Sequence, residues 1–101
     1  MRTIPDHIND ALFIDPESPT FLRWVNPIGR AKVTGVAGCR RSDGYIQLNF
    51  EGKRYFANRV VYHLVHGPVP DDVVIRHIDG NVSNNDPKNL VALKKRIKQK
   101  A

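Results

Sequence analysis

The residues from 73 to 90 constrain the fold of this chain more than any other stretch. Val73-Val74-Ile75 is typical of a short strand, and the Asp79-Gly80-Asn81 that follows has the composition of a tight turn. Asp86-Pro87 then predicts a helix start, because Asp caps helices and Pro fits the first helical position. The pattern predicts a strand–turn–helix unit whose final helix runs from about residue 87 towards 98.

The middle of the chain predicts a β-hairpin followed by a helix. Residues 45–50 alternate apolar and polar side chains at the strand period, and residues 54–57 pair back after a Glu51-Gly52-Lys53 turn. From residue 58 to 66 the apolar residues recur at helical spacing. We expect a helix there, capped by Asn58 and ended by Gly67-Pro68.

The N-terminal part predicts shorter elements and completes the fold class. Residues 6–15 have apolar side chains at roughly helical spacing and end at Pro16, residues 21–25 predict a strand, and Ser42-Asp43-Gly44 predicts a turn. Together the segments predict an α+β fold, with a β-rich N-terminal half, a hairpin and a helix before the strand–turn–helix unit. A chain of 101 residues with 41% hydrophobic content suits one domain with a modest core.

Composition excludes several classes of protein. No run of eighteen apolar residues exists, so no segment is expected to span a membrane, and the N-terminus lacks the apolar core of a signal peptide. We therefore expect a cytoplasmic protein. The single cysteine, Cys39, cannot form an internal disulfide, and the histidines stand in no zinc-ligand spacing with it. Cys39 is expected to be a partly buried or idle thiol.

Charge favours a polyanionic partner. The chain has 16 Lys and Arg against 10 Asp and Glu, which gives a net charge of +6. Such a balance favours phosphate contacts and counterion release. Residues 1–20 hold four acids and one Arg, whereas residues 91–101 hold five basic residues and no acid. The positive charge is therefore concentrated at the C-terminal end.

His77 and Asn89 are the candidate catalytic residues. Metal-assisted cleavage of a phosphodiester needs a general base, which a neutral imidazole supplies, and a divalent cation held by carboxylate, amide or imidazole groups. His77 leaves the strand beside a turn, and Asn89, one turn into the predicted helix, could hydrogen-bond across to the hairpin and fix its geometry. Asp79, Asn81, Asn84 and Asn89 are also compatible with ordinary turn and cap roles.

A series of short motifs runs in one order along most of the chain. The motifs are Phe13-Ile14-Asp15-Pro16-Glu17-Ser18 with Leu22-Arg23-Trp24, Gly44-Tyr45-Ile46 through Gly52-Lys53-Arg54-Tyr55, Arg59-Val60-Val61-Tyr62-His63 with His66-Gly67-Pro68-Val69-Pro70, and His77-Ile78-Asp79-Gly80-Asn81 with Asn84-Asn85 through Asn89-Leu90. In this order they resemble the small HNH endonucleases of phages, relatives of intron homing endonucleases. Many motifs in one order are more specific than any one of them.

The resemblance implies a ββα-metal fold, in which two strands and a helix clamp one divalent ion against a scissile phosphate. By carry-over, His77 matches the general base and Asn89 the middle asparagine that fixes the structure. The resemblance also implies a single HNH-like domain. Its parts are a β-rich N-terminal part over 1–57, a helix over 58–67, a ββα core over 72–98 and a basic tail over 99–101 of the 1–101 chain.

The chain departs from the family pattern at both metal-ligand positions. The family places an acid, commonly Asp, just before the base, where this chain has Arg76. The second ligand, usually Asn or His, is expected about nine residues after the middle asparagine, where this chain has Lys98. A further family histidine is replaced by Asn58. Guanidinium and ammonium groups cannot coordinate Mg²⁺ and would repel it.

The expected function is therefore that of a DNA-binding protein on an HNH scaffold, with lost or much weakened metal-dependent nuclease activity and no cofactor. Arg76 and Lys98 would bind the phosphate of double-stranded DNA directly. Trp24 and Tyr45 could also contact nucleic acid, although core packing is the favoured interpretation of both. The candidate nucleic-acid-binding residues are Arg40, Arg41, Arg59, Arg76, Lys94, Lys95, Arg96 and Lys98.

Two other functions stay open. One is an active HNH endonuclease or nickase that uses Mg²⁺ or another divalent cation, with other ligands such as Asp79, Asn81 or Asn85, or with an arginine-assisted chemistry. The other is a phage regulator or inhibitor that binds a host protein, for which the sequence shows no apolar surface stripe. In each case the resemblance implies the cytoplasm of a phage-infected or prophage-carrying bacterial host.

Overall fold

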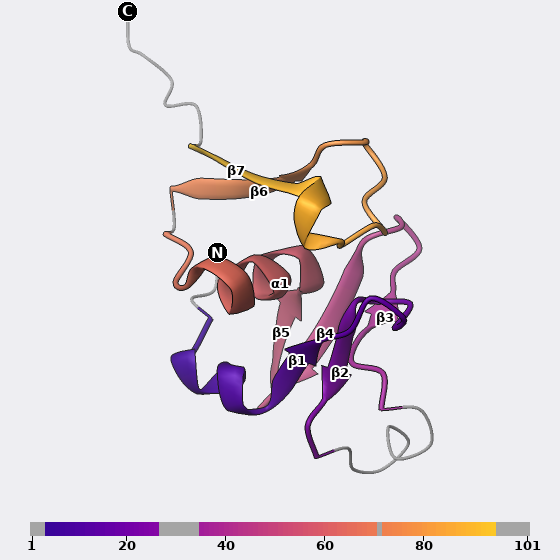
Figure 1. Ribbon diagram of the computed structural model, residues 1–101, viewed down its shortest axis with the longest axis vertical. Helices are drawn as coiled ribbons and strands as arrows, with labels where there is room; N and C mark the ends of the chain where they lie inside the picture. Colours follow the sequence, from indigo (N-terminus) through magenta and orange to yellow (C-terminus); the bar gives the residue numbers. More distant parts are fainter. Residues whose placement is uncertain (1–3, 27–34, 71, 95–101) are drawn as a thin grey trace, which may run out of the picture.

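The computed structural model describes residues 4–26, 35–70 and 72–94, and within them the chain forms one α-helix and three small antiparallel sheets (Figure 1). This confirms the predicted α+β class. Helix α1, Ala57–His66, lies between the strand pair of β6, Val73–His77, and β7, Leu90–Lys94, and the β-rich remainder of the molecule. No helix in these residues is long and apolar enough to cross a membrane.

The first sheet pairs β1, Leu12–Ile14, with β2, Leu22–Trp24, and so confirms the strand predicted near residue 22. The roughly helical spacing of residues 6–15 corresponds to a helical turn only in the first half of that segment. A 3-10 helix, η1, spans only Asp6–Asp10, and the chain then continues as β1. The spacing misled because Ile8 of η1 and Leu12 of β1 are both buried, although they belong to different elements.

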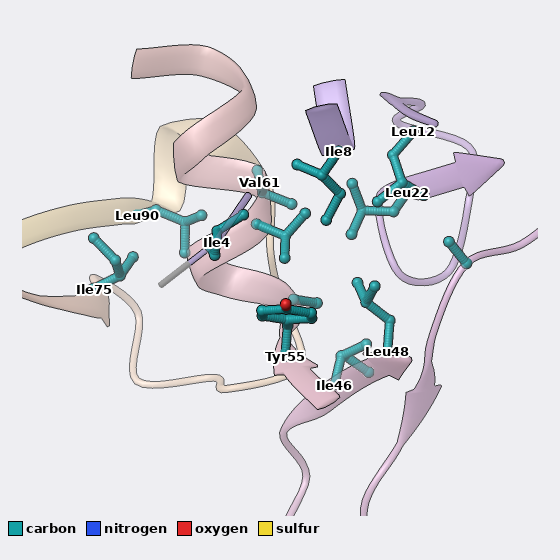
Figure 2. Close-up of a cluster of buried hydrophobic side chains, with 13 residues drawn as sticks. Ile4, Ile8, Leu12, Leu22, Ile46, Leu48, Tyr55, Val61, Ile75 and Leu90 are labelled. Carbon is teal, nitrogen blue, oxygen red and sulfur yellow. The ribbon is translucent and has the colours of Figure 1, made fainter. Parts of the chain in front are cut away.

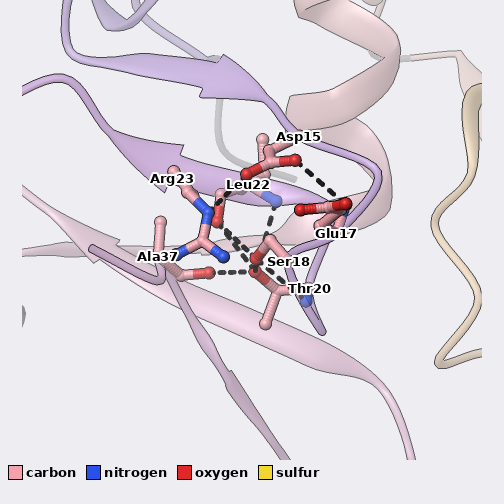
Figure 3. Close-up of polar contacts among 7 residues, drawn as sticks. All are labelled: Asp15, Glu17, Ser18, Thr20, Leu22, Arg23 and Ala37. Atoms are coloured by element: carbon pink, nitrogen blue, oxygen red, sulfur yellow. Dashed lines mark hydrogen bonds and ion pairs between the residues drawn. The ribbon is translucent and has the colours of Figure 1, made fainter. Parts of the chain in front are cut away.

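A polar cluster orders the loop between β1 and β2 (Figure 3). The backbone N–H of Glu17 and the guanidinium Nε of Arg23 donate to the two carboxylate oxygens of Asp15, and in that order of importance they lower the pKa of Asp15. The buried Thr20 hydroxyl donates to the carbonyl oxygen of Ala37, which ties the loop to the segment that precedes the central sheet. These polar groups therefore have structural partners.

The central sheet contains β3, Cys39–Arg40, β4, Ile46–Phe50, and β5, Lys53–Phe56. The hairpin predicted from alternation is confirmed, with Gln47 opposite Phe56 and Phe50 opposite Lys53. Its turn needs positive φ at two successive residues, and these are Glu51 at 53° and Gly52 at 77°. Cys39, a free thiol, is exposed at the edge of this sheet.

Helix α1 begins directly after β5, one residue earlier than predicted, and ends at Gly67 as expected, where φ is 90°. Asn58 is not its cap, because Asn58 lies inside the helix and is 7% exposed. Its side-chain Nδ2 instead donates to the carbonyl oxygen of Ile75 at 2.9 Å, and the neighbouring Arg59 donates to that of Val73 at 2.9 Å. Two polar side chains of α1 therefore hold β6 against the helix.

The final helix predicted from residue 87 towards 98 is wrong for the residues that are described. Asp86 does accept a bond from the N–H of Lys88 and Pro87 does start a helical turn, but this 3-10 helix, η3, spans only Pro87–Asn89. The chain then continues as β7, antiparallel to β6, with His77 opposite Leu90. Residues 95–98, the remainder of that prediction, lie outside the described residues.

The hydrophobic core joins the sheets through α1 (Figure 2). Val60 and Val61 of the helix are fully buried, as are Ile8 of η1 and Leu22 of β2. The other buried apolar side chains are Ile4, Leu12, Ala37, Ile46, Leu48, Tyr55, Ala57, Ile75 and Leu90. Because Ile75 and Leu90 come from β6 and β7, the strand pair that carries His77 is anchored to the same core.

Acid should destabilise the fold through His63 of α1, whose side chain is only 1% exposed. Burial lowers the pKa of His63, and the opposing effect of Asp6, 3.6 Å away, is smaller. As the pH falls through about 6.5, the unfolded chain therefore binds more protons than the folded protein does. The free energy of unfolding decreases in that range. We expect the urea midpoint to fall between pH ~8 and ~5.5 in the wild type and much less in His63→Gln.

The matched control is His66→Gln, which changes an exposed histidine of the same helix and should keep the wild-type pH dependence. If His63→Gln loses as much stability with acid as the wild type, His63 is not the group responsible.

Candidate functional site

His77 stands at the end of β6, where the strand pair opens into a loop. Just after it, the N–H of Ile78 donates to the carbonyl oxygen of Asn89 at 2.8 Å, and the pairing of β6 with β7 ends there. A pocket of about 390 Å³ lies at this place, and its lining residues are Tyr45, Val74, Ile75, Arg76, His77, Gly80 and Val82. The structure therefore brings the predicted base and the exposed Arg76 together at one pocket.

Two contacts hold the His77 ring. Its Nε2 lies 2.8 Å from the side-chain Oδ1 of Asn85, which is fully buried. The His77 ring also lies edge to face with the ring of Tyr45, at an interplanar angle of 68° and with centroids 6.1 Å apart. From the sequence, Asn85 is predicted only as an alternative metal ligand. Its partnership with His77 depends on how the loop folds back, and no local sequence signal indicates it.

The loop after His77 is built around Asp79 and Asn89. The Oδ1 of Asn89 accepts from the N–H of Asp79 at 3.0 Å, and its Nδ2 donates to the carboxylate of Asp79 at 2.9 Å and to the carbonyl oxygen of Asn84 at 3.0 Å. The predicted contact of Asn89 with the hairpin is thus confirmed, although Asn89 ends a 3-10 turn and not a first helical turn. Hydrogen bonds from Asn84, Asn81 and Asn89 lower the pKa of Asp79.

The residues at this pocket do not fit a divalent cation. Arg76 has no lone pair to offer, and within the described ranges no three His, Cys, Asp or Glu residues are grouped to hold a metal. The oxygens of Asp79 accept amide hydrogens of the loop, the Oδ1 of Asn81 accepts from the N–H of Ser83, and Asn85 is fully buried. The second predicted ligand position, that of Lys98, lies outside the described residues.

A row of aromatic side chains leads from the pocket to Arg41. The ring of Tyr45 meets His77 on one side and, edge-on at 5.7 Å, the ring of Phe56 on the other. The guanidinium of Arg41 lies 5.2 Å from the centre of the Phe56 ring, and its Nη2 lies 3.3 Å from a carboxylate oxygen of Asp43. Arg41 is therefore linked to the pocket, which the sequence could not show.

The other predicted interface residues are spread more widely. Arg40 is exposed on β3, and Lys94, 84% exposed, lies at the end of β7 opposite Val73, away from His77. The prediction for Arg59 is wrong, because Arg59 is only 6% exposed and its guanidinium bonds the backbone of β6. Lys95, Arg96 and Lys98 lie outside the described residues.

The two aromatic candidates have packing roles, as favoured from the sequence. Trp24 stacks on Phe50 with centroids 6.5 Å apart, and both pack against the core. Tyr45 is half-buried between Phe56 and His77.

Comparison with known proteins adds one match. Residues 55–100 match the model of the HNH endonuclease family. This segment contains α1, the strand pair and the loop with Asn85 and Asn89, and it includes every residue that lines the pocket except Tyr45. Neither curated proteins nor solved structures gave a significant match. The resemblance of residues 1–54 to the same family stays a prediction.

Proposed function

We propose that the chain, whose residues 55–100 match the HNH endonuclease family, binds double-stranded DNA on the HNH scaffold with metal-dependent cleavage lost or much weakened. One observation carries the proposal. Arg76, which the sequence resemblance puts at the position of a metal-binding acid, is exposed and lines the same pocket as His77. A fixed cation therefore occupies the place where the family needs a carboxylate.

The physical basis is charge substitution. A divalent ion in such a site neutralises the phosphate and polarises the bond that breaks. A guanidinium neutralises the phosphate through charge-assisted hydrogen bonds, but it generates no hydroxide nucleophile. Arg76 therefore supports binding without supporting the chemical step.

The proposed interface extends beyond the pocket in two directions. Arg41 and Arg40 supply positive charge beyond the aromatic row, and Lys94 begins the basic C-terminal segment that continues with Lys95, Arg96 and Lys98. Such contacts position the duplex and make its affinity salt-dependent. The family resemblance supports an action in the cytoplasm of a phage-infected or prophage-carrying bacterial host.

Retained nuclease or nickase activity is the second candidate, and the geometry of His77 favours it. The histidine keeps its partner Asn85, and the loop bonds of Asn89 are complete. A histidine without a role at the site would not need the contact with Asn85. Cleavage of supercoiled plasmid in Mg²⁺ or Mn²⁺ that disappears in His77→Ala would establish this function in place of the first.

Removal of Arg76 tests the binding proposal. We expect Arg76→Ala to weaken binding to a short duplex by roughly tenfold or more, because it removes a charge-assisted contact. The slope of log affinity against log salt should fall by about one. Fluorescence anisotropy over a salt series measures both quantities.

Lys53→Ala is the matched control, because Lys53 is exposed on β5 opposite Phe50, at the end of the hairpin away from Gln47 and Phe56. It removes the same charge and should leave the affinity within about threefold of the wild type. Equal losses in both variants would mean that net charge, and not this pocket, binds DNA. No measurable affinity at low salt would contradict the proposal altogether.

A further inference from the structure

The contact between His77 and Asn85 restricts which nitrogen of the imidazole carries hydrogen. The Nε2 of His77 and the Oδ1 of Asn85 are 2.8 Å apart. An amide oxygen can only accept a hydrogen bond, so Nε2 must be the donor. The neutral ring is then the Nε2–H tautomer, and Nδ1 keeps its lone pair.

We propose that Asn85 is a positioning residue that fixes this tautomer and leaves Nδ1 as the His77 atom offered to the ligand of the pocket. The proposal rests on the proposed function only in naming that ligand as a DNA phosphate or its attacking water. In the neutral ring Nδ1 can accept a proton, and in the protonated ring it can donate a hydrogen bond to a phosphate oxygen.

The surroundings of Asn85 are built to hold it still. Asn85 is fully buried, and Ser83, two residues before it, donates its hydroxyl hydrogen to the carbonyl oxygen of Gly44. Asp86, which follows it, donates its N–H to Asn84 and caps the η3 turn. The segment is therefore fixed on both sides, and the amide has little freedom to turn away from His77.

Burial of Asn85 leaves one of its polar groups without a partner. Its Nδ2 is buried and has no hydrogen-bond partner among the residues that the structure describes. A buried amide hydrogen without a partner destabilises a fold, and an apolar side chain would avoid that cost. Within residues 4–26, 35–70 and 72–94, the one side-chain bond of Asn85 is that to His77, which points to a role at the site.

Nitrogen NMR of the imidazole tests the proposal without DNA. At about pH 8.5, where histidine is neutral, we expect the Nε2 of His77 to have the chemical shift of a protonated nitrogen and Nδ1 that of an unprotonated one. Asn85→Ala should shift both resonances towards the averaged values of a tautomer mixture. Asn85→Asp, whose carboxylate also only accepts, should restore the wild-type pattern.

Asn49→Ala is the matched control, because Asn49 is exposed on β4, opposite Arg54, and does not line the pocket. It should leave both resonances unchanged. A wild-type ring with hydrogen on Nδ1, or an Asn85→Ala spectrum identical to that of the wild type, overturns the proposal. If Asn85→Ala does not fold, Asn85→Asp decides it, since a loss of the Nε2–H pattern there has the same meaning.

The DNA-binding assay separates this inference from the proposed function. A wild type with the expected tautomer and no affinity for DNA keeps the positioning role of Asn85 and removes its DNA ligand. A wild type that binds DNA with the opposite tautomer overturns only the role of Asn85.

Discussion

Replacing Arg76 with Asp and Lys98 with Asn should give the protein a divalent-cation site that the wild type lacks. The double variant, Arg76→Asp with Lys98→Asn, removes two positive charges and supplies a carboxylate and an amide, which are oxygen ligands that Mg²⁺ and Mn²⁺ accept. Titration calorimetry should detect binding of Mn²⁺ to the variant and none to the wild type. With His77 unchanged, nicking of supercoiled plasmid should rise by roughly 10²-fold, since a bound cation stabilises the reaction by several kcal/mol.

Three further variants make this result interpretable. Arg76→Asp alone and Lys98→Asn alone should each bind Mn²⁺ more weakly than the double variant, because each keeps one cation at the site. Adding His77→Ala to the double variant should remove cleavage while metal binding remains. A folded double variant that binds no metal would show that Arg76 and Lys98 do not occupy the ligand positions of the family.

Asn89→Ala should cost the fold about 2–3 kcal/mol, which is a large part of the 5–15 kcal/mol that holds a small domain together. Asn89 makes three hydrogen bonds to the loop, two of them to Asp79. Their loss leaves the loop after β6 without its central support and frees the segment that carries Asn85. We expect a lower urea midpoint, with an unchanged slope of the free energy of unfolding against urea concentration.

The comparison for this variant is Asn49→Ala, an exposed asparagine for which the structure shows no such bonds, and which should stay within about 0.5 kcal/mol of the wild type. The DNA affinity of folded Asn89→Ala should also fall, because His77 and Arg76 lie where the loop begins. Wild-type stability in Asn89→Ala would mean that water replaces the three bonds without loss.

Elements with a strong local pattern were predicted well. The hairpin of β4 and β5 follows from alternation and from a turn that accepts positive φ, and α1 follows from its apolar spacing and the glycine at its end. Both signals lie within about ten residues of chain, so no distant contact is needed to read them. The assignment of His77 and Asn89 as a pair came from motif order.

The prediction for residues 87–94 failed because two local signals compete there. Asp86 and Pro87 start a helical turn, but burial then alternates from Leu90, which is buried, through the exposed Val91 to the half-buried Ala92 and the exposed Leu93. That period of two is the period of a strand. Pairing with β6, which lies outside the segment, decides the outcome against the helix.

By itself, the sequence determined the presence of a histidine, a polar turn and an asparagine in HNH order, together with an arginine at residue 76, immediately before the histidine. These are properties of spacing and side-chain chemistry, and no fold can change them. Only the tertiary structure decided that Arg59 is buried, that Asn85 and Tyr45 hold the His77 ring, and that Arg41 reaches the pocket through an aromatic row. These contacts depend on the docking of one loop and one hairpin onto a shared core, and docking is set by packing between residues far apart in the chain.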